Sequence, residues 1–228
     1  MLPPLTPTRN DLGRDVTAHL PAAADLKGVY ALSVEHSAIW ERAVPYLKVR
    51  DNDGHTIYAY GLGRALLDLA PDADPEVVLP AILLHDTGWS QVPEPEILEA
   101  IAPGGGRPDL VLRHEEEGAR IAREVLGEVG WDAERTERIV AIVDGHDSRR
   151  EAISLDDALM KDADKLWRLT PHGVDTVMNW FGLTRDEAHR LIAGRVHDHL
   201  LTDAGRTLAL ALAAVASIDT TPQRIALA

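Results

Sequence analysis

Apolar residues recur along most of the chain at the three- and four-residue spacing of amphipathic helices, and alternating β patterns are almost absent. This periodicity predicts helices over residues 33–46, 54–69, 75–84, 109–129, 133–146, 154–169, 174–181 and 184–218. The last of these helices is predicted to break near 203–205. The pattern therefore predicts an all-α fold.

Polar and glycine residues at the predicted boundaries support several of these helix ends. Asp109 and Asp132 are the predicted N-caps of the two helices that follow them, and Gly130 is predicted to end the first of the two. Ser154 followed by Asp157 resembles a capping box. These signals agree with the boundaries that the periodicity predicts.

Two stretches depart from the helical pattern. Residues 1–27 carry several prolines, and we expect them to be poorly ordered, which leaves 28–228 as one generous domain. Residues 89–108 combine prolines with a run of three glycines. This composition predicts a long connection with at most one short helix, near 95–101. Connections of this length often serve as lids or binding segments.

Five polar residues occupy positions where their helices otherwise show apolar side chains: His55, His85, His114, His146 and Asp162. A single histidine on an apolar face is more often a core residue whose hydrogen bonds are satisfied. Five such positions on separate helices are harder to explain in that way. Buried carboxylates need a compensating cation, and imidazole with carboxylate is a suitable ligand set for a first-row divalent ion. The helices are therefore predicted to converge on a metal site.

The order of these residues resembles the HD superfamily. Residues 84–88 (Leu-His-Asp-Thr-Gly) closely match the central signature of that family, and 161–166 (Lys-Asp-Ala-Asp-Lys-Leu) are similar to its terminal aspartate motif. The resemblance covers roughly residues 50–170. It implies an HD-domain helical bundle with extra N- and C-terminal helices.

The resemblance also implies a ligand set for one or two divalent transition metals. His114 and His146 match the subset of the superfamily that holds two metals, and they would complete the second site. The first metal would be bound by His55, His85, Asp86 and Asp162, with Asp86 as the bridge. Two ions joined in this way suit two-metal hydrolysis. Manganese or iron is the expected metal, and magnesium, nickel and cobalt are alternatives.

One position departs from the family pattern. Many members have a lysine three residues after the signature aspartate, whereas this chain has Trp89 three residues after Asp86. We expect Lys165, Arg64 or Arg168 to contact an anionic substrate instead, with Trp89 beside them. Asp86 and Lys165 are the expected catalytic residues. The alternative for Lys165 is a surface lysine paired with a neighbouring aspartate.

Composition narrows the functional classes. The chain has 37 acidic against 23 basic side chains, a formal net charge of −14 and no cysteine. This charge disfavours nucleic-acid binding, and the lack of cysteine excludes disulfides and thiolate chemistry. No apolar stretch reaches the length of a membrane span, and the first 14 residues lack the apolar core of a signal peptide. We expect a cytoplasmic protein that acts on a small anionic molecule.

Two further features have structural interpretations. The run Glu115–Glu117 is interpreted as a solvated helix face, although Glu115, Asp144 or Asp147 could also act as an outer-shell base. The last predicted helix is rich in alanine and leucine, which is compatible with a homodimer.

Three functions fit this ligand set. The first is metal-dependent hydrolysis of a phosphate ester of a nucleotide or other small phosphorylated metabolite by an activated water. The second is the mixed-valence di-iron oxygenase chemistry that a smaller branch of the superfamily implies. The third is a non-catalytic helical metal-binding or scaffold protein. The ligands alone do not separate these functions, and we favour the hydrolase because that activity is more common in the family.

Overall fold

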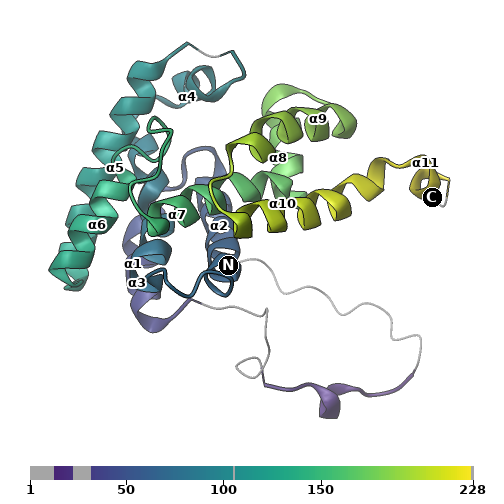
Figure 1. The fold of residues 1–228 in the computed structure, drawn as a ribbon, viewed down its shortest axis with the longest axis horizontal. Helices are drawn as coiled ribbons and strands as arrows, with labels where there is room; N and C mark the ends of the chain where they lie inside the picture. The colour runs from purple at the N-terminus through teal and green to yellow at the C-terminus, as the bar shows by residue number, and fades with distance from the viewer. Residues whose placement is uncertain (1–12, 23–31, 105, 227–228) are drawn as a thin grey trace. The chain divides into compact units, whose positions relative to one another are not determined.

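The computed structural model describes residues 13–22, 32–104 and 106–226, and these contain helices but no strand (Figure 1). The predicted all-α fold is therefore confirmed. The chain divides into two units, residues 1–31 and 32–228. In the first, Thr17–His19 forms a turn of 3-10 helix. The prediction of poor order for 1–27 lies outside the described residues at 1–12 and 23–27.

The second unit is built from successive helices with short connections. The α-helices are α1 (Val34–Ala43), α2 (Asn52–Leu67), α3 (Pro75–Leu84), α4 (Glu94–Ile101), α5 (Pro108–Val129), α6 (Ala133–Val143), α7 (Leu155–Leu166), α8 (Pro171–Phe181), α9 (Arg185–Val196), α10 (Asp203–Ala216) and α11 (Pro222–Ile225). The 3-10 helices of this unit are Val44–Tyr46, η4 (Val49–Asp51), η5 (His85–Gln91), Trp167–Leu169, His197–His199 and Ser217–Thr220. None of the helices in the described residues is long and apolar enough to cross a membrane.

Most of the predicted helix ends are close to the observed ones. The side chains of Asp132 and Ser154 accept backbone N–H bonds at the starts of α6 and α7, and Gly130 ends α5 in the left-handed conformation. The predicted cap at Asp109 is wrong, because α5 already begins at Pro108, whose fixed φ suits the first turn. The predicted break in the last helix lies earlier, between α9 and α10.

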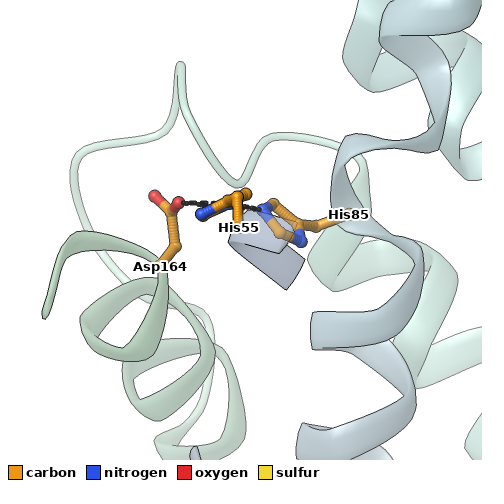
Figure 2. A group of neighbouring side chains, drawn as sticks. All are labelled: His55, His85 and Asp164. Carbon is orange, nitrogen blue, oxygen red and sulfur yellow. Dashed lines mark hydrogen bonds and ion pairs between the residues drawn. The ribbon is translucent and has the colours of Figure 1, made fainter. Parts of the chain in front are cut away.

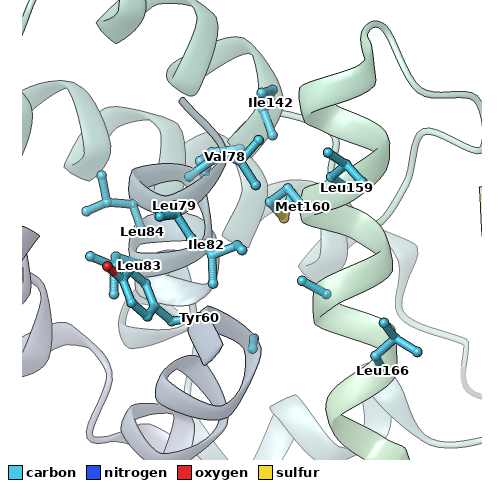
Figure 3. Packing of buried hydrophobic residues seen from close by; sticks show 14 of the residues in the cluster. Tyr60, Val78, Leu79, Ile82, Leu83, Leu84, Ile142, Leu159, Met160 and Leu166 are labelled. Atoms are coloured by element: carbon cyan, nitrogen blue, oxygen red, sulfur yellow. The ribbon is translucent and has the colours of Figure 1, made fainter. Parts of the chain in front are cut away.

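α3 is the central helix of the core. All residues from Val77 to Leu84 are buried, so this helix is hydrophobic on every side. It contacts α2, α6 and α7, and its side chains interdigitate with Tyr60 of α2 and Leu159 of α7 (Figure 3). Fully burying each large aliphatic side chain stabilises the fold by about 1.5–3 kcal/mol. The residue that follows Leu84 therefore enters the centre of the bundle.

A glycine contact sets the position of η5 against α5. A Cβ atom on Gly88 would lie 1.8 Å from the His114 carbonyl oxygen and 2.5 Å from the Gly118 nitrogen. Only glycine allows this backbone-to-backbone approach. The glycine of the Leu-His-Asp-Thr-Gly signature thus brings His85 and Asp86 beside His114.

Candidate metal centre

Two histidines are oriented by the backbone at the ends of their helices. His85 Nδ1 lies 2.8 Å from the Ile82 carbonyl oxygen, and His146 Nδ1 lies 2.8 Å from the Val143 carbonyl oxygen. A carbonyl can only accept a hydrogen bond, so each Nδ1 carries a proton and donates it. In the neutral ring each Nε2 then presents a lone pair to the interior of the bundle, and such backbone bonds orient metal-binding imidazoles in this way.

His55, His85 and Asp164 form a first trio (Figure 2). His55 Nε2 lies 3.0 Å from His85 Nε2 and 3.3 Å from Asp164 Oδ1, and His85 Nε2 lies 3.7 Å from that same oxygen. The three residues come from α2, η5 and α7, and all are buried. Their ligand atoms all lie within 4.8 Å of one another, which is close enough to hold one ion.

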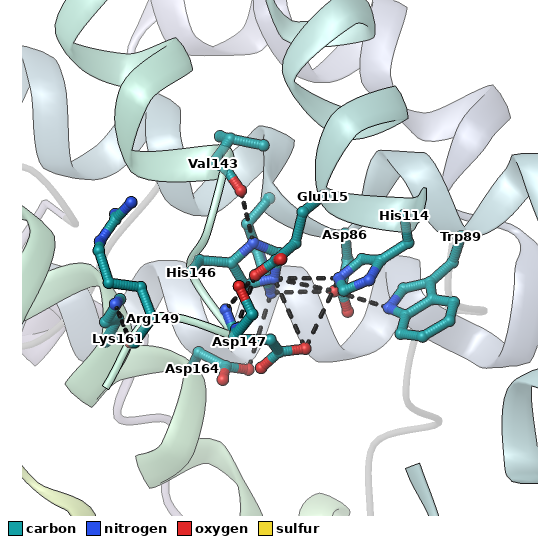
Figure 4. A network of polar contacts seen from close by, with 12 residues as sticks. Asp86, Trp89, His114, Glu115, Val143, His146, Asp147, Arg149, Lys161 and Asp164 are labelled. Carbon is teal, nitrogen blue, oxygen red and sulfur yellow. Dashed lines mark hydrogen bonds and ion pairs between the residues drawn. The ribbon is translucent and has the colours of Figure 1, made fainter. Parts of the chain in front are cut away.

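His114, His146 and Asp147 form a second trio (Figure 4). His114 Nε2 lies 3.4 Å from His146 Nε2 and 3.6 Å from Asp147 Oδ2. His114 comes from α5, and the other two come from the turn after α6. This helix was predicted to reach residue 146 but ends at Val143. His146 therefore lies in the turn, three residues after the helix end.

Asp86 lies between the two trios. Its Oδ1 is 3.6 Å from His85 Nε2 and 3.7 Å from His146 Nε2, while its Oδ2 is 3.5 Å from His55 Nε2. One carboxylate thus faces histidines of both trios, which is the arrangement that a bridging ligand requires. The bridging role of Asp86 stays a prediction, and the position of its carboxylate suits it.

The two buried carboxylates nearest the histidines, Asp86 and Asp164, remain ionised. Burial alone would raise the pKa of Asp86, but the imidazoles around it, His85 first, hold this pKa well below its usual range. Burial likewise opposes the charge on Asp164, whereas Arg168 and the hydrogen bond from His55 hold the pKa of Asp164 well below its usual range. The cluster therefore contains carboxylate charge that requires positive charge nearby.

The histidines of the second trio show where that positive charge is held. Burial opposes the charged form of His146, yet Asp147 and Asp86 raise its pKa to about 10. Burial and the neighbouring His146 lower the pKa of His114 to about 4. A proton on His146 thus balances the carboxylates when no cation does. Divalent ions bind neutral imidazole and release such protons, so these residues fit a metal site.

The predicted ligand Asp162 is replaced by Asp164. The Asp162 carboxylate accepts hydrogen bonds from Leu201 N (2.8 Å), Thr202 N (2.9 Å) and Thr202 Oγ1 (2.7 Å), and so fastens the start of α10 to α7. A Cβ atom on Gly205 would lie 2.3 Å from its Oδ2, so the absence of a side chain there permits the approach. Asp164, two residues later, points to the histidines instead.

The predicted substrate contacts are distributed over three places. Lys165 and Arg168 line the cavity that borders Asp164. Arg64 lines a different hollow with Tyr60, because nine residues after His55 amount to about two and a half helical turns and place it on the opposite face. The prediction for Arg64 is therefore corrected.

Trp89 lies behind the ligands and not in the cavity. It is 2% exposed, its ring stacks on His114 at 3.8 Å between centroids, and its Nε1 donates to Asp86 Oδ1 at 3.1 Å. The structure thus corrects the predicted substrate contact. Trp89 thus orients Asp86 and His114.

Arg50 is a cation that sequence reasoning missed. It has φ of 56° inside η4, and its guanidinium lies 4.6 Å from the Trp180 ring and 5.6 Å from the Trp89 ring. Burial lowers its pKa, while Asp86 acts in the opposite direction. No helical periodicity marks this residue, because it lies in a turn before α2. It adds positive charge beside the metal ligands.

Glu115 fixes the turn that carries the second trio. It is 2% exposed, and its Oε1 accepts hydrogen bonds from Asp147 N at 2.7 Å and Ser148 N at 2.8 Å. The interpretation of the run Glu115–Glu117 as a solvated face is therefore wrong for its first member. On the other side of the turn, buried Lys161 donates to the Arg149 carbonyl at 2.6 Å (Figure 4).

Replacing Glu115 with glutamine is expected to weaken metal binding at the second trio by about 10- to 100-fold, as for other outer-shell changes. Both backbone donors bind the same oxygen, so the neutral amide would weaken both hydrogen bonds, and the turn with Asp147 would loosen. Metal titration by calorimetry measures the effect. The exposed neighbour Glu116→Gln is the matched control, and equal affinities in both variants would contradict the positioning role.

A cavity of about 330 Å³ opens beside the cluster. Asp147 and Asp164 reach it from the two trios, so a molecule in this space would meet both parts of the cluster. Residues of the connection 89–108 also line it, through Ala100 and Ile101. The predicted short helix in that connection is present as α4.

Comparison with known proteins identifies one family to which the chain is similar. Searches among curated proteins and among solved structures found no match. The HD domain family matches residues 52–169, more than half of the chain, and this span contains every member of the two trios together with Asp86. The match confirms the resemblance inferred over roughly 50–170, and the chain belongs to the HD-domain family.

Proposed function

We propose that this chain is a metal-dependent hydrolase that acts on a small phosphate ester. The observation that carries the proposal is the cavity in which the metal-binding residues Asp147 and Asp164 lie beside Lys165, Arg168 and Arg195. Metal ligands next to side-chain cations suit an anionic substrate whose charge redistributes during the reaction. This arrangement favours hydrolysis of a phosphate ester over a purely structural metal site.

Different residues of the chain would bind the metal ions and the phosphate group. His55, His85, Asp86 and Asp164 would hold one divalent ion, and Asp86 with the second trio would hold another. When bound, such ions supply an activated water and neutralise phosphate charge. The cations Lys165 and Arg168 orient the phosphate group, since guanidinium and ammonium groups donate charge-assisted hydrogen bonds to its oxygens.

Asp147 is the carboxylate of the cluster that meets solvent. Its side chain is 39% exposed, whereas the other carboxylates of the cluster are buried, so it alone among them meets both the cavity and bulk water. Its backbone is held by Glu115, which fixes the direction of the carboxylate. Asp147 would therefore hold the second ion at the side of the cluster that faces the cavity, and the catalytic role of Lys165 stays a prediction.

Metal binding is expected to stabilise the fold. At a free metal concentration of about 100 times Kd, binding to the native state alone contributes about 2.7 kcal/mol. For a chain of this size that raises Tm by roughly 5–10 °C. Differential scanning calorimetry of chelator-treated and reloaded protein measures the shift. Identical Tm values with and without manganese, iron, magnesium, nickel or cobalt would contradict a resident metal.

The proposed activity is tested on protein purified without added metal. Metal content is measured by mass spectrometry, and phosphate release is then followed with a panel of phosphomonoesters for each reloaded metal. Release that requires metal supports the hydrolase. Two irons per chain, with oxygen uptake and no phosphate release, would replace it with the di-iron oxygenase. Full metal loading with neither activity would favour a metal-binding scaffold.

A further inference from the structure

The cavity beside the cluster has two chemically different halves. One half carries the cations Lys165, Arg168 and Arg195 next to the metal-binding carboxylates. The other half is apolar. Most of it comes from α8 and α9 (Val177, Trp180, Phe181, Leu191 and Ile192), and the rest comes from α4 and α5 (Ala100, Ile101 and Val111). A single small molecule that fills the cavity would therefore meet charge at one end and hydrocarbon at the other.

The cations near the cluster keep their charge available. Lys165 Nζ donates to the Lys161 carbonyl at 3.3 Å, and Arg168 Nη1 donates to the Asp164 carbonyl at 3.1 Å. Carbonyl acceptors orient these side chains without neutralising them. Arg168 also lies 3.8 Å from the Asp164 carboxylate, which binds metal in the proposed function. Both cations thus suit the oxygens of a bound anion.

The residues of the apolar half, here called the wall, are packed into the fold. Ile192 is 2% exposed, and Leu191, Trp180 and Phe181 are half-buried. The Trp180 ring lies 6.2 Å from the Phe181 ring. α9 is fastened across the cavity, because Arg195 Nη1 donates to the Ile101 carbonyl at the end of α4 at 3.2 Å. Apolar side chains therefore enclose this half from two directions.

The described lining contains no amide or hydroxyl side chain that could read the hydrogen-bonding edge of a nucleobase. Its polar members are Asp147, Asp164, Lys165, Arg168, Arg195 and His199. Except for His199, these lie at the end of the cavity beside the metal-binding carboxylates. Specific sites for polar ligands require paired donors and acceptors, since unpaired ones cost binding energy. The apolar wall instead favours a ligand that buries apolar surface against it.

Resting on the phosphate-ester chemistry of the proposed function, we propose that the substrate is amphipathic: a phosphate group joined to an apolar aryl or short alkyl alcohol. The phosphate lies between the cluster and the cations, and the alcohol part packs against α8 and α9. Five of the eight apolar lining residues follow residue 169, where the family match ends, and Ala100, Ile101 and Val111 precede it. Helices outside the shared domain thus supply most of the apolar surface that selects the substrate.

The test uses full-length, manganese-loaded protein and three non-hydrolysable phosphonates, titrated by calorimetry in the absence of dioxygen. Methylphosphonate carries the anionic head alone, while phenylphosphonate and hexylphosphonate add an apolar part. We expect the phenyl or hexyl compound to bind at least tenfold more tightly than methylphosphonate. Equal affinity of all three, or binding of none by fully loaded protein, would overturn the proposal.

Two variants assign the preference to the wall. Phe181→Ala and Leu191→Ala are each expected to reduce the tenfold preference to threefold or less without changing methylphosphonate affinity. Leu212→Ala on α10 is the matched control, since it is also a half-buried core leucine but does not line the cavity. A preference that survives both wall variants would overturn the assignment. Phosphate release is measured separately, so a failed hydrolase is distinguished from a failed wall.

Discussion

Replacing Asp86 with alanine is expected to remove metal from both trios and to lower the rate of phosphate release by more than about 100-fold. Loss of an outer-shell partner alone typically costs about 10- to 100-fold, and Asp86 faces the histidines directly. Its two oxygens lie 3.5–3.7 Å from the Nε2 atoms of His55, His85 and His146. Metal content by mass spectrometry and phosphate release by a colorimetric assay measure the two effects.

Two controls separate the bridging role of Asp86 from general damage. Asp144→Ala removes an exposed aspartate near His146 and should leave metal content unchanged. His114→Ala should weaken metal binding at the second trio while the first trio keeps its ion, because His114 contacts only the second. Retention of one ion in Asp86→Ala, or equal loss of both ions in His114→Ala, would contradict a carboxylate shared between two sites.

The sequence was informative wherever a polar residue lay on a single apolar face. His55, His85, His114 and His146 each interrupt such a face, and the structure brings all four together. Their convergence follows from elementary packing, since apolar faces meet in one core and polar residues on those faces must meet there too. The all-α fold followed from the same periodicity, and the family from the spacing of the motif.

The sequence failed where burial no longer selects a face. In α7 every residue from Asp156 to Asp164 is buried, so an apolar stripe beside Asp162 does not show which side meets the histidines. Glu115 was missed for a related reason: its neighbours in the glutamate run are more exposed, and only the turn after α6 buries it. Arg50 lies in a turn, where periodicity gives no signal.

Asp162→Asn and Asp164→Asn, two isosteric changes on one helix, are expected to separate stability from metal binding. Asp162 accepts three hydrogen bonds at the start of α10, and an amide would retain one acceptor and oppose the other donors. Leaving buried donors unsatisfied costs roughly 2–3 kcal/mol. For a chain of this length Tm should fall by roughly 5–10 °C. Metal affinity should remain within a few-fold of the parent protein.

Asp164→Asn, unlike Asp162→Asn, should lose metal affinity. Its carboxylate lies 3.3 Å from His55 Nε2 and 3.7 Å from His85 Nε2, so the amide removes a charged ligand from the first trio. In chelator-treated protein the Tm should also fall, because Arg168 and the hydrogen bond from His55 stabilise the charged form of Asp164 in the fold and hold its pKa well below the usual range. Calorimetric unfolding with chelator and metal titration without it measure both variants, and each variant controls for the other. Loss of metal affinity in Asp162→Asn as large as in Asp164→Asn would restore Asp162 as a ligand, and would mean that the start of α10 moves away from α7 when metal binds.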